Sequence, residues 1–216
     1  MSEKLNKTTE ITCTQGLASP LVYVAKIPAG ESPGILSTDR QKEIDRASLM
    51  SVKLQKYWSW VLLERVIFDA VKMTAEEAGV RRGSHGGLTS DRLFLSISHT
   101  CSFVAVAVSE KAIGVDIEEF GTHNVDKLAS RYFVGGEIPV WLRGCKTNPE
   151  EAFLRLWCAK EAAFKSLSES VFAPGKLDST LYKTRCERIA IGATELILAL
   201  ASLECDEARI KVIELH

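Results

Sequence analysis

Two short stretches of the sequence carry acidic and basic side chains at spacings that could hold a metal-bound pyrophosphate. The first is Gly-Val-Asp-Ile-Glu at residues 114–118, and the second is Trp-Cys-Ala-Lys-Glu-Ala at residues 157–162. Carboxylates suit Mg²⁺, which usually takes only one or two of them and leaves its other positions to water and phosphate oxygens. Together the two stretches predict a site for a magnesium-bound phosphate compound.

The first stretch has the pattern of a strand with one buried face. Apolar residues alternate with Asp116 and Glu118, and this period of two is typical of a half-buried strand. The two carboxylates therefore point the same way and lie about 7 Å apart, because a strand rises about 3.3 Å per residue. The alternative is an edge strand whose outer face is merely solvated, and the Asp-x-Glu pattern alone favours that alternative.

The second stretch lies on a predicted helix whose beginning is well marked. An asparagine that can cap the helix and a proline that suits its first position stand at residues 148–149. Trp157, Glu161 and Lys165 follow at every fourth position and share one stripe, with Lys160 on the adjoining one. A Glu and a Lys four apart are usually an exposed ion pair. Here Trp157 indicates partial burial, which is costly for ions unless a metal or phosphate compensates them, so both interpretations stay open.

The motifs together resemble those of the 4′-phosphopantetheinyl transferases, which move phosphopantetheine from coenzyme A to a serine of a carrier protein. Besides the two stretches, the Ser-His pair at residues 98–99 and the segment at residues 129–137 match the family. The length of 216 residues is similar to that of the surfactin-type members. The resemblance implies an α+β fold of two pseudo-symmetric halves, each a small, mainly antiparallel sheet packed against a long helix, with the active site in the cleft between them.

The resemblance also implies roles for the matching residues. Asp116, Glu118 and Glu161 would bind Mg²⁺, with Mn²⁺ as a substitute, and coenzyme A would be the substrate. Glu161, Lys165 and Asp116 would act in catalysis. Glu161 would complete the metal shell or take the serine proton, and Lys165 would stabilise phosphate oxygens. The residues expected to bind the coenzyme are Ser98, His99, Lys53, Lys56, Lys160 and Lys165. For Lys53 and Lys56 a solvated helix face is an equal alternative, and Lys165 is favoured over Lys160 because it shares the stripe of Glu161.

The loop at residues 81–87 departs from the family pattern. Members of this type often carry Gly-Lys-Pro shortly before the Ser-His pair, whereas this chain has Arg-Arg-Gly-Ser-His-Gly-Gly. Arg81, Arg82 or Arg92 could take over a phosphate contact, because a guanidinium binds phosphate through two parallel hydrogen bonds. A glycine-rich surface loop is the alternative, so the groups that bind the 3′-phosphate stay open.

The resemblance implies transfer of 4′-phosphopantetheine to a serine hydroxyl of an apo acyl or peptidyl carrier protein, with release of adenosine 3′,5′-bisphosphate. The acidic helix of the carrier is expected to dock at Arg131, Tyr132 and Phe133, although the two aromatic residues could instead be core. A non-catalytic protein of this fold that binds coenzyme A or carrier proteins is an alternative, but all three carboxylates are present. A magnesium-dependent phosphohydrolase is another, but it leaves the Ser-His and Trp-x-x-Lys-Glu-Ala motifs unexplained.

Regular elements must hold these motifs in place, and their order is repeated. Strand, long helix and hairpin occur twice, which predicts an N-terminal half over residues 1–111 and a C-terminal half with the metal motifs over residues 112–216. Strands are predicted over residues 21–27, 113–118 and 209–215, helices over residues 49–73 and 149–167, and hairpins over residues 93–109 and 187–201.

Composition and charge narrow the class of protein. The net charge of −1 gives no support to nucleic-acid binding. No apolar run approaches the length of a membrane span, and the first ten residues have no apolar signal-peptide core. Six cysteines without Cys-x-x-Cys spacing indicate reduced thiols. We therefore expect a cytoplasmic protein that binds neither nucleic acid nor membrane, and the resemblance to the surfactin-type members implies a monomer.

Overall fold

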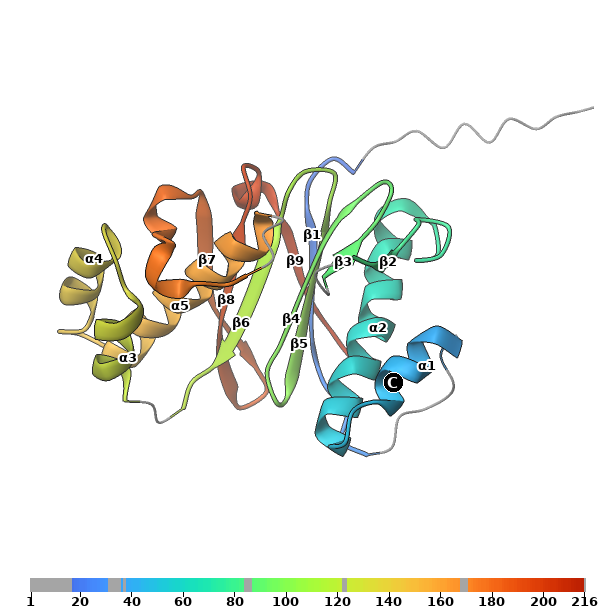
Figure 1. Cartoon of the computed structure of the whole chain (residues 1–216), viewed down its shortest axis with the longest axis horizontal. Helices are drawn as coiled ribbons and strands as arrows, with labels where there is room; N and C mark the ends of the chain where they lie inside the picture. Colours follow the sequence, from blue (N-terminus) through green and yellow to red (C-terminus); the bar gives the residue numbers. More distant parts are fainter. Residues whose placement is uncertain are drawn as a thin grey trace, which may run out of the picture.

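Two sheets face each other, and one long helix covers the outer face of each (Figure 1). The structure is a computed structural model, and it describes residues 17–30, 36, 38–83, 87–121, 124–167 and 171–215. The fold is α+β, as predicted, and its sheets are small. Among the described residues, no helix is both long enough and apolar enough to span a membrane.

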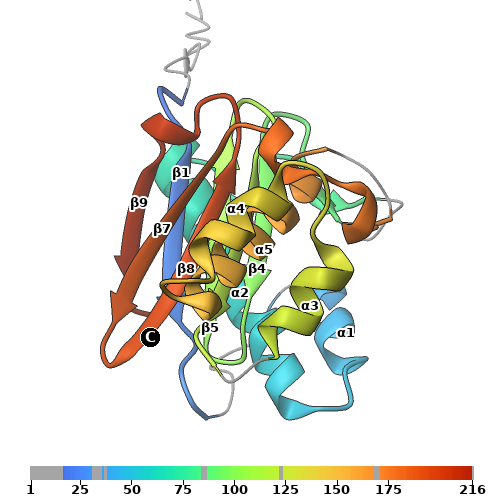
Figure 2. The same cartoon turned by 90° about the vertical axis from the view of Figure 1, so that its left-hand side faces the viewer.

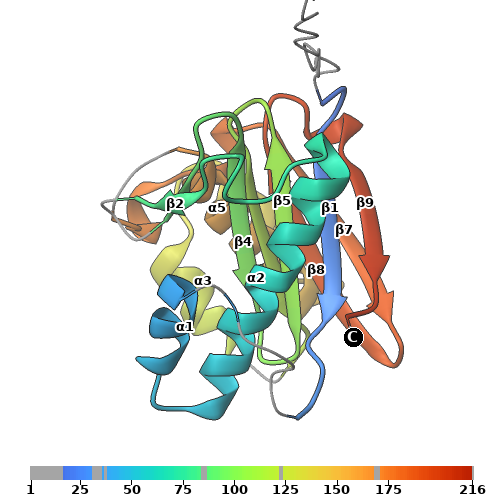
Figure 3. The same cartoon turned by 90° about the vertical axis from the view of Figure 1, so that its right-hand side faces the viewer.

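The first sheet has the strand order β4-β5-β1-β9. Its strands are β1 (Leu21–Lys26), β4 (Phe94–His99), β5 (Phe103–Ser109) and β9 (Arg209–Ile213). The strands β4 and β5 form a hairpin, and β5 runs antiparallel to β1. The long helix α2 (Met50–Val71) packs on the outer face of this sheet, with α1 (Thr38–Asp45) beside it (Figure 3).

The second sheet has the strand order β6-β8-β7 and is antiparallel throughout. Its strands are β6 (Gly114–Glu119), β7 (Thr184–Ile191) and β8 (Thr194–Ala201). The helix α5 (Pro149–Ser166) covers its outer face, with α3 (Val125–Tyr132) and α4 (Glu137–Gly144) outside it (Figure 2). The short segments are β2 (Arg81–Arg82), β3 (Leu88–Thr89), and the 3₁₀ turns η1 (Pro174–Lys176), η2 (Ser179–Leu181) and η3 (Cys205–Glu207).

Alternation along the strands divides the buried side chains among three cores. In β1, Val22 and Val24 lie in the core between the two sheets, whereas Tyr23 lies in the core beneath α2. In β8, Leu198 faces the other sheet and Ile197 faces α5. Because successive strand residues point to opposite faces, each sheet can bury both of its faces.

The long elements match the sequence prediction to within a few residues. α5 begins as expected, since the side chain of Asn148 accepts a hydrogen bond of 3.1 Å from the backbone N–H of Glu151, and Pro149 follows the cap. The hairpin of β7 and β8 turns at Gly192, whose φ of 62° lies in the left-handed region that glycine adopts readily. The helices α1 and α4 and the strands β2 and β3 were not predicted.

The last strand joins the two parts of the chain. β9 runs parallel to β1, with Leu21 opposite Arg209 and Ala25 opposite Ile213. The first sheet therefore takes strands from both ends of the sequence. The predicted division between residues 111 and 112 stays a prediction. The first sheet contains strands from both sides of that division, because β9 belongs to the predicted C-terminal half.

Candidate active site

A glycine sets how closely β6 approaches α5. A Cβ placed on Gly114 would lie 1.9 Å from the carbonyl oxygen of Ala162 and 2.8 Å from the backbone nitrogen of Ser166. No real Cβ tolerates such a contact, so a larger residue here would push the strand and the helix apart. Because side chains alternate along a strand, Asp116 and Glu118 share the helix-facing side of Gly114.

The buried carboxylate of Asp116 is the centre of the site. Its side chain is 2% exposed. Its Oδ1 accepts a hydrogen bond of 2.7 Å from the Ser98 hydroxyl and another of 2.7 Å from the Lys165 ammonium. Its Oδ2 is buried without a hydrogen-bond partner. The alternative of a merely solvated strand face is therefore wrong.

Lys165 and Glu161 bring the helix stripe to this carboxylate. The Lys165 ammonium lies 3.6 Å from a Glu161 oxygen and 3.1 Å from the Ser98 hydroxyl. Burial lowers the pKa of Lys165, but the charges of Asp116 and Glu161 outweigh it and raise the pKa above its ordinary value. The ammonium therefore stays protonated at neutral pH.

The carboxylates around Lys165 repel one another. Burial, followed by the charges of Asp116 and Glu161, raises the pKa of Glu118 to about 7. Burial and the charge of Asp116 likewise raise the pKa of Glu161. One lysine thus faces three carboxylates, and an additional positive charge would reduce the repulsion between them.

The donor set fits a hard divalent cation. Carboxylate oxygens are the ligands that Mg²⁺ and Mn²⁺ prefer, and the unpartnered Oδ2 of Asp116 is a buried acceptor that needs a partner. Across the described residues, no three His, Cys, Asp or Glu side chains are gathered into a ready-made metal site. The ammonium of Lys165 contacts Asp116 and Glu161 instead.

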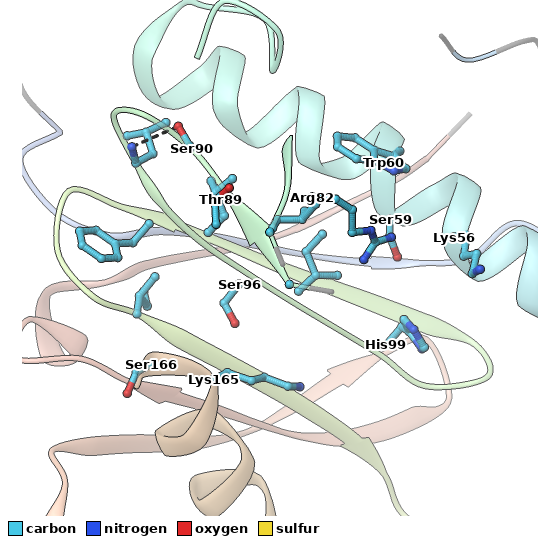
Figure 4. Close-up of a pocket in the computed structure, with 18 of the residues that line it drawn as sticks. Lys56, Ser59, Trp60, Arg82, Thr89, Ser90, Ser96, His99, Lys165 and Ser166 are labelled. Carbon is cyan, nitrogen blue, oxygen red and sulfur yellow. Dashed lines mark hydrogen bonds between the residues drawn. The ribbon is translucent and has the colours of Figure 1, made fainter. Parts of the chain in front are cut away.

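A cavity of about 910 Å³ opens beside this cluster. Figure 4 shows that Lys56 and Trp60 reach it from α2 and that Lys165 reaches it from the end of α5. His99, the last residue of β4, also lines it. Burial and the charge of Lys165 lower the pKa of His99, so its imidazole is neutral at pH 7 and has one N–H to donate.

Two more cations lie on the α2 side of the cavity. Arg82 donates two hydrogen bonds, each of 2.8 Å, to the carboxylate of Glu43 on α1. Lys56 donates to the backbone oxygen of Glu43 at 3.2 Å. Both cations and Glu43 line the cavity, and Lys53 is not among the described residues that do.

The other two arginines considered for phosphate binding lie elsewhere. Arg81 pairs with Asp91 at 2.6 Å, and the guanidinium of Arg92 lies 3.9 Å from the sulfur of Met73. Arg82 is therefore the arginine that the structure places at the cavity. The middle of their loop, residues 84–86, lies outside the described part of the chain.

Lys160 is a buried structural lysine, contrary to its expected role in binding the coenzyme. Its side chain is fully buried and its ammonium lies 2.7 Å from Glu137. The ammonium also donates to the backbone oxygen of Pro174 at 2.8 Å and to that of Leu177. All three N–H groups are thus used by partners that do not line the cavity, and the side chain cannot contact a molecule bound there.

Two serines of β4 connect the two sheets at the site. The hydroxyl oxygen of Ser96 accepts a hydrogen bond of 2.9 Å from the backbone N–H of Val115. Two residues further along β4, Ser98 donates to Asp116, the residue that follows Val115 on β6. Ser98 was expected to bind the coenzyme, but its hydroxyl donates its hydrogen bond to the carboxylate of Asp116. The sequence carried a signal for this contact, since two serines stand at alternate positions among the apolar residues of β4. Glu43 and Trp60 were missed, because the tertiary fold alone brings them to the cavity.

The sequence of this chain is similar to those of known proteins. Residues 112–191 match the sequence model of the 4′-phosphopantetheinyl transferase superfamily. The chain is 24% identical over 145 residues to the 4′-phosphopantetheinyl transferase gsp of Aneurinibacillus migulanus, an alignment that covers 64% of this chain and 60% of that protein. It is 28% identical over 160 residues to the 4′-phosphopantetheinyl transferase AcpT of Salmonella typhimurium, covering 73% of this chain and 78% of that protein. The AcpT of Salmonella typhi gives the same values.

Proposed function

Because its residues 112–191 carry the signature of the 4′-phosphopantetheinyl transferase superfamily, we propose that the chain transfers 4′-phosphopantetheine from coenzyme A to a carrier protein. The acceptor is a serine hydroxyl of an apo acyl or peptidyl carrier, and adenosine 3′,5′-bisphosphate is released. The observation that carries the proposal is the cluster of Asp116, Glu118, Glu161 and Lys165 beside a cavity of about 910 Å³.

The reaction is a displacement at the β-phosphorus of coenzyme A. A bond forms from the serine oxygen to this phosphorus, and the bond from the phosphorus to the bridging oxygen breaks. The bridging oxygen leaves with the adenosine bisphosphate, and the serine loses its proton. Such a transfer needs little covalent chemistry from the protein, which must mainly position the groups and neutralise charge.

The described side chains can supply these functions. Asp116, Glu118 and Glu161 would hold Mg²⁺, whose charge would offset that of the pyrophosphate. Glu161 is also suited to accept the serine proton, directly or through a water molecule, because its pKa is raised towards neutral pH and a base is most effective there. Lys165 and the neutral imidazole of His99 reach the cavity, where each can donate a hydrogen bond to phosphate oxygens.

The adenosine end of the coenzyme is assigned to the α2 side of the cavity. Lys56 and Arg82 supply positive charge there in place of the missing Gly-Lys-Pro. A guanidinium can bind a phosphate through two parallel hydrogen bonds, and a phosphate bound in this way would replace Glu43 as the acceptor of the two that Arg82 donates. A role of Lys53 in binding the coenzyme has weaker support. Lys53 lies on α2 but is not among the described residues that line the cavity.

The carrier protein is assigned to the surface around Arg131. The exposed Arg131 stacks on the ring of Tyr132, with its guanidinium carbon 5.1 Å from the ring centre. Tyr132 in turn lies 5.3 Å from the ring of Trp157, one turn before Glu161. Phe133 is core, because it is 5% exposed and packs against Trp141 and Phe153. An acidic carrier helix would thus meet a cation linked by packing to the catalytic helix.

The remaining expectations complete the proposal. The cleft between an N-terminal half at residues 1–111 and a C-terminal half at residues 112–216 holds the coenzyme. The chain acts as a cytoplasmic monomer without nucleic-acid or membrane partners, which agrees with its net charge of −1 and with the unpaired cysteines of the described residues.

A mass measurement tests the function against its two alternatives. The full chain is incubated with coenzyme A, Mg²⁺ and an apo carrier protein, and the carrier is then weighed. A gain of the phosphopantetheine mass supports transfer. Binding of the coenzyme without a mass gain favours a non-catalytic protein, and consumption of the coenzyme without modified carrier favours a phosphohydrolase.

A further inference from the structure

The positive charge nearest to Asp116 belongs to the protein itself. The Lys165 ammonium donates at 2.7 Å to Asp116 Oδ1 and lies 3.6 Å from Glu161. These are two of the three carboxylates to which the proposed function assigns the divalent cation. In the free protein, the ammonium therefore already neutralises part of the charge that a metal ion would neutralise.

A metal ion and this ammonium cannot share Asp116 without cost. A magnesium ion binds carboxylate oxygens at about 2.0–2.1 Å, so an ammonium hydrogen-bonded to the same carboxylate would be a close like charge. The side chain of Asp116 is 2% exposed, so little water screens this repulsion. Binding of the metal ion is therefore favoured when the ammonium moves away.

The structure provides Lys165 with a place to move to. The residue lies in the last turn of α5, its side chain is 26% exposed, and it lines the cavity beside the cluster. Its flexible stem can swing the ammonium into the cavity, where an anionic ligand would accept its hydrogen bonds. Lys160 has no such freedom, because it is fully buried with three partners.

We infer that Lys165 is the resident counter-ion of the metal site, which holds Asp116 until a divalent cation arrives together with a pyrophosphate. The inference rests on the proposed function and adds to it a coupling between the binding of the metal ion and that of the pyrophosphate. The free protein binds a divalent cation alone weakly, and a pyrophosphate strengthens that binding by giving the ammonium a new acceptor. By thermodynamic linkage the metal ion strengthens pyrophosphate binding by the same factor.

Metal titration of the free protein tests this inference. Binding of Mn²⁺ to the full chain is followed by electron paramagnetic resonance, without coenzyme, for the wild type and for Lys165→Met. The variant is expected to bind Mn²⁺ about tenfold more tightly, within the range typical of coupled sites. Lys111→Met serves as the matched control, since it removes a lysine that pairs with Glu204 outside the cavity lining, and its Mn²⁺ affinity is expected to equal that of the wild type.

A second, milder variant keeps the inference testable if Lys165→Met does not fold. Lys165→Gln removes the charge but keeps an N–H donor for Asp116, and its expected gain in Mn²⁺ affinity has the same direction. Inorganic pyrophosphate, added as a probe, is expected to tighten Mn²⁺ binding to the wild type more than to either variant. Equal or weaker Mn²⁺ binding by both variants in the absence of pyrophosphate overturns the inference.

The two possible failures are distinguishable. If the wild type modifies a carrier but the Lys165 variants gain no Mn²⁺ affinity, the counter-ion role is wrong and the transferase function stands. If the variants gain Mn²⁺ affinity but the wild type leaves the carrier unmodified, the counter-ion role is supported and the transferase function is wrong.

Discussion

Two buried carboxylates of this protein differ in how completely their oxygens are hydrogen-bonded. Glu137 accepts hydrogen bonds from the backbone N–H and hydroxyl of Ser179, from the backbone N–H of Val134 and from Lys160. Both of its oxygens are used, as structural buried charges require. Asp116 has one oxygen with two partners and one with none. The hydrogen bonds of the first carboxylate are complete within the fold, whereas the second keeps a buried acceptor that the proposed metal ion could use.

Replacing one glutamate tests the catalytic cluster. Glu161→Gln keeps the side-chain shape but can neither accept the serine proton nor hold a metal ion as well, so kcat is expected to fall by about 10²- to 10⁴-fold. The measurement is the initial rate of carrier modification at saturating coenzyme A. Glu195→Gln, which changes an exposed carboxylate paired with Arg188 on the second sheet, is the control and should keep the rate. Near-normal transfer by the Glu161 variant would contradict both proposed roles of this residue, as a metal ligand and as the proton acceptor.

The raised pKa of Glu118 makes stability depend on pH. Because burial and the Asp116 charge raise it from 4.5 to about 7, the folded metal-free protein holds more protons than the unfolded chain between these values. The contribution of this group to the free energy of unfolding therefore falls as pH rises through that window. Glu118→Gln lacks the effect, so its stability relative to the wild type should increase with pH. Urea unfolding in the presence of a chelator, at both ends of the window, measures the difference, and a constant difference contradicts the assigned pKa.

At the scale of elements, the contact between β6 and α5 decides whether the site exists. Both elements and their interior faces could be predicted, since apolar residues alternate along the strand and recur at helical spacing on the helix. α1 and α4 are only eight residues each, and α4 contains Pro139, so neither shows a sustained helical pattern. The sequence could not reveal that adjacent Lys160 and Glu161 have separate surroundings, because that depends on how α4 and the η1–η2 segment pack on α5.

A single methyl group at the contact of β6 and α5 should disturb both stability and activity. Gly114→Ala places a Cβ where the Ala162 carbonyl lies, and such overpacking is expected to lower the free energy of unfolding by about 1–3 kcal/mol. Carrier modification should fall more than unfolding alone explains, because the carboxylates shift relative to Lys165. Gly175→Ala, whose nearest atom is 3.9 Å away, is the control and should change stability by less than about 0.5 kcal/mol. Equal behaviour of the two variants in urea unfolding and transfer assays would contradict the close approach.

At the scale of the whole molecule, the two parts of the chain are held together by shared structure. The core between the sheets contains residues of both, and β9 completes the first sheet from the far end of the sequence. Ser96 and Ser98 add hydrogen bonds across the junction beside the site. The division into halves stays a prediction, and the shared core and sheet mean that the two parts of the chain do not stand apart.

The four tryptophans allow this unity to be tested. Trp58 and Trp60 lie on α2, whereas Trp141 and Trp157 lie on α4 and α5. Fluorescence of the Trp58→Phe/Trp60→Phe variant and of the Trp141→Phe/Trp157→Phe variant reports on opposite parts of the molecule. At equal stability, each urea transition should coincide with the loss of helical circular dichroism of the same variant. Two separated transitions in either variant would mean that the parts unfold independently.

The pairing of β1 with β9 also constrains how the chain can fold during its synthesis. Protein synthesis adds about 5–20 residues per second, and domains generally fold as they emerge, the N-terminal one first. Here Leu21 must wait for Arg209, its partner across the sheet, to leave the ribosome. The edge of β1 that pairs with β9 therefore stays open until β9 has been synthesised, and an open strand edge readily pairs with other chains. The nascent chain is therefore most exposed to such pairing in the interval between the synthesis of β1 and the synthesis of β9.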